Sequence, residues 1–498
     1  MSTAFGSINT NVSGLEALNS LGNTNQTING LQNQLSTGLA INSPAENPAG
    51  YTIAQGFTTQ INGSNQGISN ANQAVSLLQT ATGALGQQTS ILQNVRTIAV
   101  QAANGTNTAA DLNSLQSTVG NLVAQVSTIS QQTQFNGINL LDGSFSGAQF
   151  QVGANQGQVI TASIGSTAAA NLGMYQTQAS GAYTGTTGSN ANGLAYVAST
   201  SGAFTSGTMQ VYGSQGSGTV TVTSSGESAA SVASSVNQVS NLTGVNAQAY
   251  TSVAFNVTST GDVSFSMGNG TSGSLNNAVN ISASITSSSA SGMSSLVQSI
   301  NSNSSTTGIS ASVNTKNQLV LTDVNGNNIS MNNYSGSVSM TDSAGGLTLT
   351  AGTPSSGSSS SSGATIQGVV AFQSASAFTV SGGSNVGASS GSALVNLNQV
   401  NVSTQYGASQ AITIVGYAIQ QLNQQGTQLG AVQQRVQSAL SNEQTTNTND
   451  QAAQSVIQDA NIPQVSTQLT QAQVLQQAGI AALSASSQTQ QAYLKLIP

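Results

Sequence analysis

The sequence predicts an α+β protein in which helical segments at both ends of the chain enclose a β-rich central insert. Apolar residues recur at helical spacing near both ends, whereas residues 171–397 are rich in Gly and Ser and alternate over short stretches. Because both ends carry the same kind of apolar stripe, the terminal helices should pair into a coiled coil. That coiled coil should continue into an elongated helical bundle with a β-hairpin. The insert is long enough for two or more small modules.

Two helices are predicted in the first hundred residues, over 7–39 and 53–101. The first carries four apolar residues close to heptad spacing, and Gly38 followed by Ser43-Pro44 ends it. These four residues are Leu21, Ile28, Leu31 and Leu35. The second helix carries its own apolar stripe, and Asn104-Gly105 is a typical helix end.

A third helix should begin after Thr108, because Thr108-Ala-Ala-Asp111 is a capping-box pattern in front of an apolar run. The spacing within that run is that of a helix packed on other helices, and an ordinary core within one chain is the favoured interpretation. The run consists of Leu112, Leu115, Val119, Leu122, Val126 and Ile129. Turn signals then end the helix, and residues 148–164 alternate around Asn155-Gln-Gly157 as expected for a hairpin.

The insert contains an internal repeat with an offset of 64 residues. Val236-Asn237 followed by Gly244-Val245-Asn246-Ala247 matches Ile300-Asn301 followed by Gly308-Ile309-Ser310-Ala311. The repeat predicts tandem units near 228–267 and 292–331, each a short helix, a turn at the Gly and a hairpin. The predicted hairpins run from Val253 to Met267 and from Gln318 to Met331. The run from Ser355 to Gly363 is of low complexity and predicts a loop.

Helical pattern returns near residue 408, and the stretch from Asp450 to Pro463 is expected to break or bend this helix. The last helix is predicted over about 464–496, with Leu469, Leu475 and Leu483 on its apolar stripe. The predicted terminal domain therefore comprises 1–44 and 455–498, and the predicted rod comprises 45–170 and 398–454. Residues 171–397 form the insert.

Composition excludes several classes of function. Charged residues make up 3% of the 498 residues, against about 25% in a typical protein. The four basic residues are Arg96, Lys316, Arg435 and Lys495, too few and too widely spaced for a nucleic-acid footprint or for attraction to a membrane surface. No run of about 18 apolar residues predicts a membrane span. A basic n-region is also lacking, so no Sec-type signal is expected.

The chain lacks the side chains of most catalytic sites. It has no His and no Cys, which removes the Ser-His-Asp triad, thiol nucleophiles and zinc sites that use these ligands. It has no phosphate-binding glycine motif either. We therefore expect neither enzymatic activity nor a cofactor or metal.

The low charge has two interpretations. The net charge is −7 at neutral pH and would become about +4 in strong acid, where carboxylates are protonated. Few groups change state on acidification, which would suit an acidic habitat. The alternative is drift towards polar uncharged residues on an extracellular surface.

The terminal helices have little to bury against within one chain. Segments 7–39 and 464–496 are rich in Gln, Asn and Ser outside their stripes. Isolated helices of this kind are marginally stable and gain stability from partners. Packing between molecules is the favoured interpretation for these two segments.

Five motifs resemble bacterial flagellin, in the same order along the chain. The N-terminal motifs are Leu35–Ser43, Gln93–Thr106 and Gln132–Gly143, and the C-terminal motifs are Gln428–Gln437 and Gln471–Gly479. The duplicated unit of the insert is also similar to an insertion module of flagellins.

The resemblance implies a subunit that polymerises with itself into the filament used for swimming. The terminal helices would line the filament channel, the rod would form a second layer, and the insert would face outward. The resemblance also implies unfolded export through the flagellar type III apparatus with a chaperone, and an extracellular location. Other implied partners are the filament cap, the hook-junction proteins and O-linked glycans on exposed Ser and Thr. A hook–filament junction protein and a flagellin-like sheath or adhesive component are the alternatives.

The sequence departs from the family pattern in the segment that a vertebrate innate immune receptor reads. Arg96 and Ile98 are present, but many relatives carry a basic residue where this chain has Asn94. This departure predicts weak receptor activation. Arg435 is the only charged residue of its helix before Glu443, and we interpret it as pairing with a carboxylate or with another subunit, rather than as a solvated residue.

Overall fold

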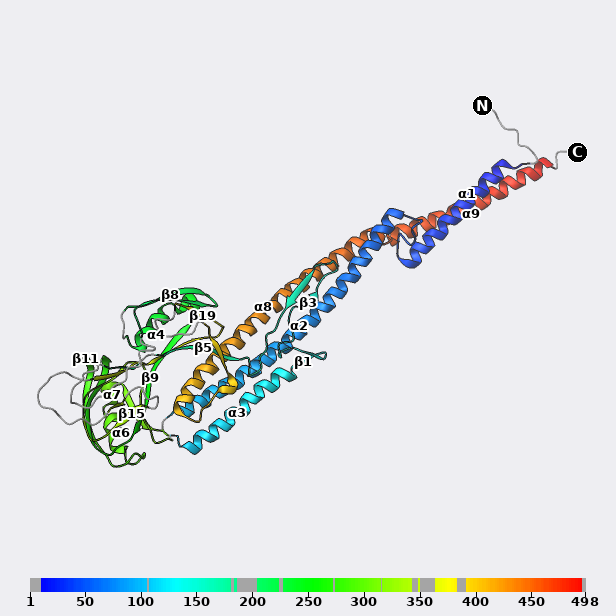
Figure 1. Cartoon of the computed structure of the whole chain (residues 1–498). Helices are drawn as coiled ribbons and strands as arrows, with labels where there is room; N and C mark the ends of the chain where they lie inside the picture. The colour runs from blue at the N-terminus through cyan, green and yellow to red at the C-terminus, as the bar shows by residue number, and fades with distance from the viewer. Residues whose placement is uncertain are drawn as a thin grey trace. The chain divides into compact units, whose positions relative to one another are not determined.

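The computed structural model describes residues 10–104, 107–180, 183–185, 204–223, 227–271, 274–314, 316–342, 348–349, 363–382 and 391–494 (Figure 1). The chain forms two compact units. One comprises Met1–Thr82, Phe145–Ser163 and Gln428–Pro498, and the other comprises Gly83–Ser144 and Ile164–Thr427. Helices at both ends and sheets in the middle confirm the predicted α+β class. The three-part domain division stays a prediction.

Five long helices make up most of the helical part of the described chain. They are α1 (Val12–Thr37), α2 (Pro48–Ala102), α3 (Ala109–Gln132), α8 (Gln405–Gln458) and α9 (Ile462–Leu494).

Local signals explain where these helices begin. The side chain of Asn11 accepts from the Gly14 N–H at 2.8 Å and begins α1. Helix α2 begins five residues before the predicted start, because Asn47 caps it and Pro48 needs no N–H at the first helical position. The predicted capping box of Thr108 and Asp111 is present at the start of α3.

The break predicted between Asp450 and Pro463 is present, near the C-terminal end of that stretch. Helix α8 runs unbroken through Asp450 to Gln458, and the chain leaves helical geometry only at Asp459–Asn461. Asp450 lies in the helix interior and has no backbone property that would end a helix. Pro463 lies in the first turn of α9, where its missing N–H costs no hydrogen bond.

Two short hairpins lie between α3 and the insert. Strands β1 (Gln134–Phe135) and β2 (Ile138–Asn139) are joined by Asn136 and Gly137. Both turn residues have positive φ, 51° and 79°, the geometry that Asn-Gly favours in a tight hairpin. Strands β3 (Ala148–Gln151) and β4 (Val159–Ala162) pair antiparallel and form the hairpin predicted for 148–164.

The described part of the insert contains three antiparallel sheets, whose strands are labelled in Figure 1. One has the order β11 (Ser274–Ile285), β10 (Gly261–Thr271), β14 (Ile329–Gly336), β17 (Gly363–Ile366) and β6 (Tyr183–Gly185). The largest has the order β12 (Ile309–Val313), β13 (Leu319–Asp323), β9 (Asn246–Val257), β18 (Val369–Ser374), β5 (Gly173–Ser180) and β20 (Ala393–Asn396). In addition, β15 (Met340–Asp342) pairs with β9, and β16 (Thr348–Leu349) pairs with β15. The third has the order β19 (Thr379–Ser381), β7 (Gly207–Gly213) and β8 (Gly216–Val222).

Two separate hydrophobic cores hold the insert together. In the first, the five-stranded sheet faces β12, β13, β15 and the second half of β9, with Phe255, Met267 and Ile281 fully buried. Helix α6 (Ser294–Asn301) packs on this core, and α7 (Ser304–Thr307) and the 3-10 helix η2 (Leu397–Gln399) are short connections. In the second core, α4 (Ala229–Gln238) packs with β7, β8, β18, β19 and the first half of β9 around Phe372.

The repeated segments have the same hydrogen bonds in both positions. Asn237 donates to the Ala247 carbonyl at 2.9 Å and accepts from the Ala247 N–H at 2.8 Å. Asn301 makes the same pair with Ala311, at 2.8 and 2.7 Å. In both copies a second short helix, α5 (Ser240–Thr243) in the first and α7 in the second, ends at a Gly with φ of 71° or 76°. The side-chain amide thus ties each helix to the strand that follows it.

Neither hairpin predicted in the repeat units exists. Strands β9 and β10 belong to different sheets, and so do β13 and β14. The two sheets enclose one core, so buried and exposed residues alternate along these strands as they would in a hairpin. Alternation in the sequence therefore cannot distinguish strands of two facing sheets from strands of one hairpin. The second unit instead contains the hairpin β12–β13. The predicted loop from Ser355 lies outside the described residues up to Gly363, where β17 begins.

Candidate assembly surface

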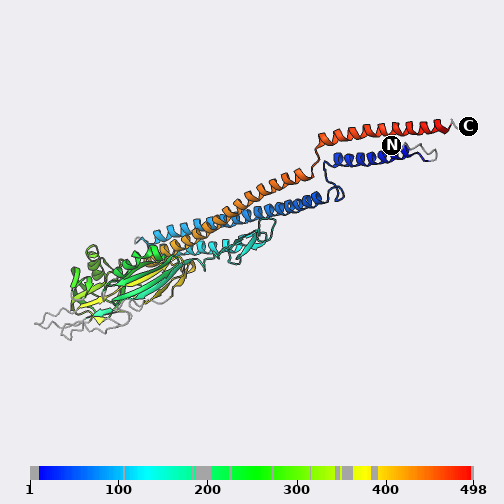
Figure 2. The same ribbon diagram turned by 90° about the horizontal axis from the view of Figure 1, so that it is seen from above.

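Helices α1 and α9 lie side by side in both views, antiparallel to each other (Figures 1 and 2). Their shared core contains four buried residues, with Ala460 and Leu469 packed against it. The four are Ile28, Leu31, Val465 and Ala472. The pairing of the two terminal helices is therefore an apolar seam between residues more than 430 positions apart.

Polar contacts at both ends of the seam fix its register. Near the chain ends, Ser486 donates to the Asn11 side-chain oxygen at 3.1 Å, and Gln476 donates to the Asn25 oxygen at 2.6 Å. At the other end the Ala460 N–H donates to the Gly38 carbonyl at 2.8 Å. These bonds use amides, hydroxyls and backbone groups and no charged side chain.

The predicted assembly residues fall into two groups. Ile28, Leu31 and Leu469 lie in or against the seam, and Leu21 is half-buried above Gly479. Leu35 is 39% exposed and Leu475 is 56% exposed, whereas Leu483 is half-buried. The sequence pattern did not identify Ala460 and Ala472, because alanine is common on all helix faces.

Pairing leaves a large apolar surface uncovered. Of the sixteen large apolar side chains that are exposed in the described part of the chain, nine belong to α1, α9 and the end of α8. We call these nine residues the terminal apolar surface. They are Val12, Leu15, Leu18, Leu35, Val456, Ile462, Val474, Leu475 and Ile480. Helices that are apolar on more than one face are typically buried against further partners.

The buried residues of α3 differ slightly from the predicted apolar run. Val119, Val123 and Val126 are buried, whereas Leu112, Leu115, Leu122 and Ile129 are half-buried. A straight helix drifts relative to a strict seven-residue repeat, which brings Val123 into the core in place of Leu122.

The remaining predicted residues lie on helix surfaces. Asn94 and Arg96 of α2 are exposed, and Ile98 is half-buried. Arg435 of α8 is exposed and has no hydrogen bond or ion pair among the described residues. Lys495 lies outside the described residues. The roles of Arg435 and of the receptor-like segment stay predictions.

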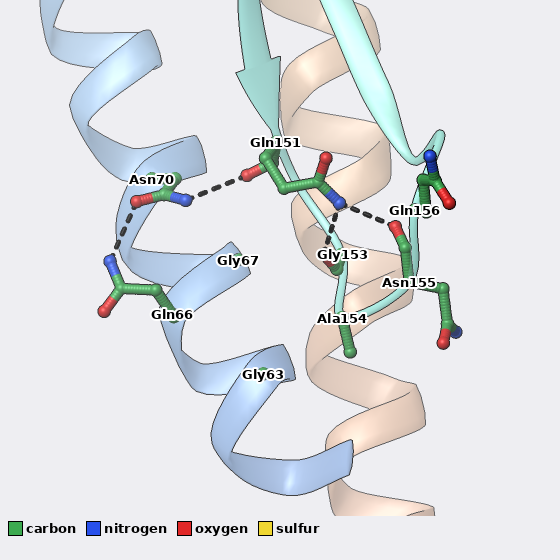
Figure 3. A pocket seen from close by; sticks show the side chains of 9 residues that line it. All are labelled: Gly63, Gln66, Gly67, Asn70, Gln151, Gly153, Ala154, Asn155 and Gln156. Atoms are coloured by element: carbon green, nitrogen blue, oxygen red, sulfur yellow. Dashed lines mark hydrogen bonds between the residues drawn. The ribbon is translucent and has the colours of Figure 1, made fainter. Parts of the chain in front are cut away.

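A shallow hollow of about 360 Å³ lies where the β3–β4 hairpin packs on α2 (Figure 3). Asn70 of α2 donates to the Gln151 carbonyl at 3.1 Å, and Gln151 donates to the carbonyls of Gly153 and Asn155 at 2.8 and 2.7 Å. The lining has no charged or nucleophilic group, so the hollow offers neither acid–base chemistry nor metal ligands. Throughout the described residues, no group of three carboxylates is placed to hold a metal ion.

None of the helices in the described residues is long and apolar enough to cross a bilayer.

Three family models match the chain. The bacterial flagellin N-terminal helical region matches residues 8–146, and the bacterial flagellin C-terminal helical region matches residues 412–497. The flagellin hook IN motif matches residues 274–325, which contain β11, α6, α7, β12 and β13. The first two matches include the helices that form the seam.

Known proteins and solved structures also resemble the chain. The B-type flagellin of Pseudomonas aeruginosa is 33% identical over 505 aligned residues, which cover 98% of this chain and 99% of that protein. Among solved structures, FliC from Burkholderia pseudomallei has 21% identity and a TM-score of 0.29, covering 73% of this chain and 99% of that chain. The flagellar junction protein FlgL from Legionella pneumophila has 11% identity and a TM-score of 0.31, covering 82% of this chain and 100% of that chain.

The low TM-scores leave the assignment to the sequence matches. A relative aligned over nearly its whole length and two terminal family models agree with the paired helical ends. The chain therefore belongs to the bacterial flagellins, the structural subunits of the extracellular flagellar filament.

Proposed function

We propose that the terminal apolar surface is the assembly device of this filament subunit. The observation that carries the proposal is the concentration of exposed apolar side chains on helices already paired through another face. Each such side chain contributes about 1.5–3 kcal/mol when fully buried. Burial of half the surface would contribute on the order of 10 kcal/mol before the entropic cost of association.

The double variant Leu15→Ser and Leu18→Ser tests this directly. Both side chains are more than half exposed in the free chain, so the substitutions should leave the fold of the monomer unchanged. We expect the variant to remain in the supernatant under conditions where the wild-type chain sediments as filaments. Circular dichroism of the monomer checks that α1 persists.

Leu242→Ser is the matched control. Leu242 is 60% exposed but lies in α5 of the insert, so this variant should polymerise normally. Sedimentation of the double variant to the same extent as wild type would contradict the proposal. Electron microscopy of the pelleted wild-type protein provides a further check, because a hook–filament junction protein alone should not form long filaments.

The proposal also includes partners that act during export and assembly. The apolar core between α1 and α9 contains only four buried side chains among the described residues, which supports export in an unfolded state through the flagellar type III apparatus with a chaperone. Addition beneath a filament cap, beyond the hook-junction proteins, would then let the ends fold. Exposed Ser and Thr of the insert are proposed acceptors for O-linked glycans. Mass spectrometry of the intact protein from filaments would detect the added mass.

A further inference from the structure

One stretch of the α2–α8 contact is polar where a long helix pair is normally apolar. Glu443, Asn447, Asp450 and Gln454 follow one another at spacings of 4, 3 and 4, so they share one face of α8. Glu443 is 9% exposed and Asn447 is 6% exposed. These side chains occupy the positions at which a helix seam buries Leu or Val.

Hydrogen bonds establish that this face contacts α2. The Asn447 amide donates to the Ile61 carbonyl at 3.3 Å and to the Asn65 side-chain oxygen at 3.2 Å. The Gln454 amide donates to the Thr58 hydroxyl at 2.7 Å. Residues 54–65 of α2 and 443–454 of α8 therefore form one antiparallel contact, which we call the polar seam.

The same face of α8 is apolar two heptads earlier, within the same compact unit. Leu429, Val436, Glu443 and Asp450 are successive positions seven residues apart. Leu429 is 2% exposed and Val436 is fully buried. On α2, Ala71, Ala74 and Leu78 are fully buried as well. One helix pair thus changes from an apolar to a polar seam along its length.

Several groups in the polar seam lack hydrogen-bond partners. The Ser64 hydroxyl and one carboxylate oxygen of Asp450 are buried without a partner among the described residues. Glu443 also accepts no hydrogen bond from any described residue, but its carboxylate oxygens keep contact with solvent. Buried polar groups that lose water without gaining a partner destabilise the closed state, and buried carboxylates do so most. The polar seam should therefore be held more weakly than the apolar stretch beside it.

We propose that the polar seam is a separately opening segment of the free subunit. It opens while the apolar stretch around Leu429 and Val436 stays closed, so the α2–α8 pair behaves as two cooperative units. The asymmetry arises from the chain itself and does not depend on the proposed role of the terminal apolar surface.

Hydrogen exchange of the full-length monomer, followed by mass spectrometry, tests this. The exchange protection of amides 443–454 should be at least about tenfold lower than that of amides 429–436, because one unpartnered buried group already corresponds to such a factor. Equal protection of the two stretches, or their joint exchange in one event, would overturn the proposal.

Seam-filling variants identify the cause. Glu443→Leu with Asp450→Leu should raise the protection of 443–454 at least about tenfold and leave 429–436 unchanged. Gln444→Leu with Asn449→Leu is the matched control, because both positions lie in the same turns but are exposed. Equal slowing in the control pair would contradict the proposal. If leucine disturbs folding, Glu443→Gln with Asp450→Asn removes the charge at constant volume and should still raise protection.

Discussion

At the scale of single residues, glycines on α2 decide how closely the β3–β4 hairpin can approach. A Cβ built on Gly63 would lie 2.8 Å from the Ala154 Cβ, and one on Gly67 would lie 2.9 Å from the Val152 carbonyl carbon and oxygen. Cβ atoms in proteins essentially never lie that close to another atom, so the hairpin would have to shift. A backbone shifts less easily than the end of a flexible side chain. Helix α2 therefore carries glycine at these positions to admit the hairpin backbone (Figure 3).

Alanine substitutions at Gly67 and Gly56 should have opposite effects on stability. Gly56 lies in the same helix with open space around it, so Gly56→Ala should raise the free energy of unfolding by about 0.5–1 kcal/mol. Gly67→Ala should lower it by about 1–2 kcal/mol, because displacement of the hairpin outweighs the gain in helix propensity. Urea unfolding of the monomer measures both. Equal stabilisation by the two substitutions would show that the hairpin does not rest on Gly67.

A second residue links the fold of the insert to pH. Asp323 is fully buried at the end of β13, and burial raises the pKa of its carboxyl although the Asn325 N–H donates to it at 2.8 Å. The folded state therefore binds this proton more tightly than the unfolded chain does. The ionised carboxylate costs stability at neutral pH, and that cost disappears as the pH falls through the raised pKa.

The variant Asp323→Asn should therefore differ from wild type in a pH-dependent way. Relative to the variant, the wild-type chain should gain thermal stability between neutral pH and about pH 4, where an ordinary carboxyl titrates. Thermal unfolding of the insert at several pH values gives the difference in Tm. Asp262→Asn is the control, because Asp262 is exposed on β10. A loss of wild-type stability relative to the variant on acidification would have the wrong sign and refute the argument.

At the scale of elements, the sequence predicted what depends on neighbouring residues. The capping box of Thr108 and Asp111 and the Asn136-Gly137 turn are local signals, and both are present in the structure. Helix existence was predictable from periodicity for the same reason. The break expected between Asp450 and Pro463 is present at Asp459–Asn461, although the sequence did not indicate where in that stretch it would fall.

Features that depend on distant partners were not predictable from pattern. The strand pairings of β9 and β10 depend on which sheet each joins, and alternation looks the same in both cases. The polar seam escaped notice because a search for apolar periodicity stops where Glu443 replaces an apolar residue. Helix packing through Ala460 and Ala472 was not predicted, because alanine occurs on buried and exposed helix faces alike and so gives no apolar periodicity.

At the scale of the whole molecule, side-chain amides make polar contacts that charged side chains make in other proteins. Side-chain amides tie α1 to α9, each helix–strand unit of the insert to itself, and α8 to the sheet through Gln421, which donates to the Ala375 carbonyl at 2.6 Å. Neutral hydrogen bonds of this kind do not change with pH or salt. A polymer repeats every ionisable group along its length, so replacing charges with amides avoids rows of like charge.

Acidification should therefore leave assembled filaments intact. Hydrogen bonds from Thr108 and Ser144 lower the pKa of Asp111 and Asp142, so these residues contribute stability at neutral pH that is lost as the pH falls. Asp111 is exposed and Asp142 is half-buried; such carboxylates near the surface keep that loss small, and buried Asp323 acts in the opposite direction. We expect sedimentation of wild-type filaments to be unchanged from pH 7 to below about pH 4, where ordinary carboxyls are largely protonated. Depolymerisation near that pH would mean that the few remaining carboxylates, rather than amides and apolar contacts, hold the subunits together.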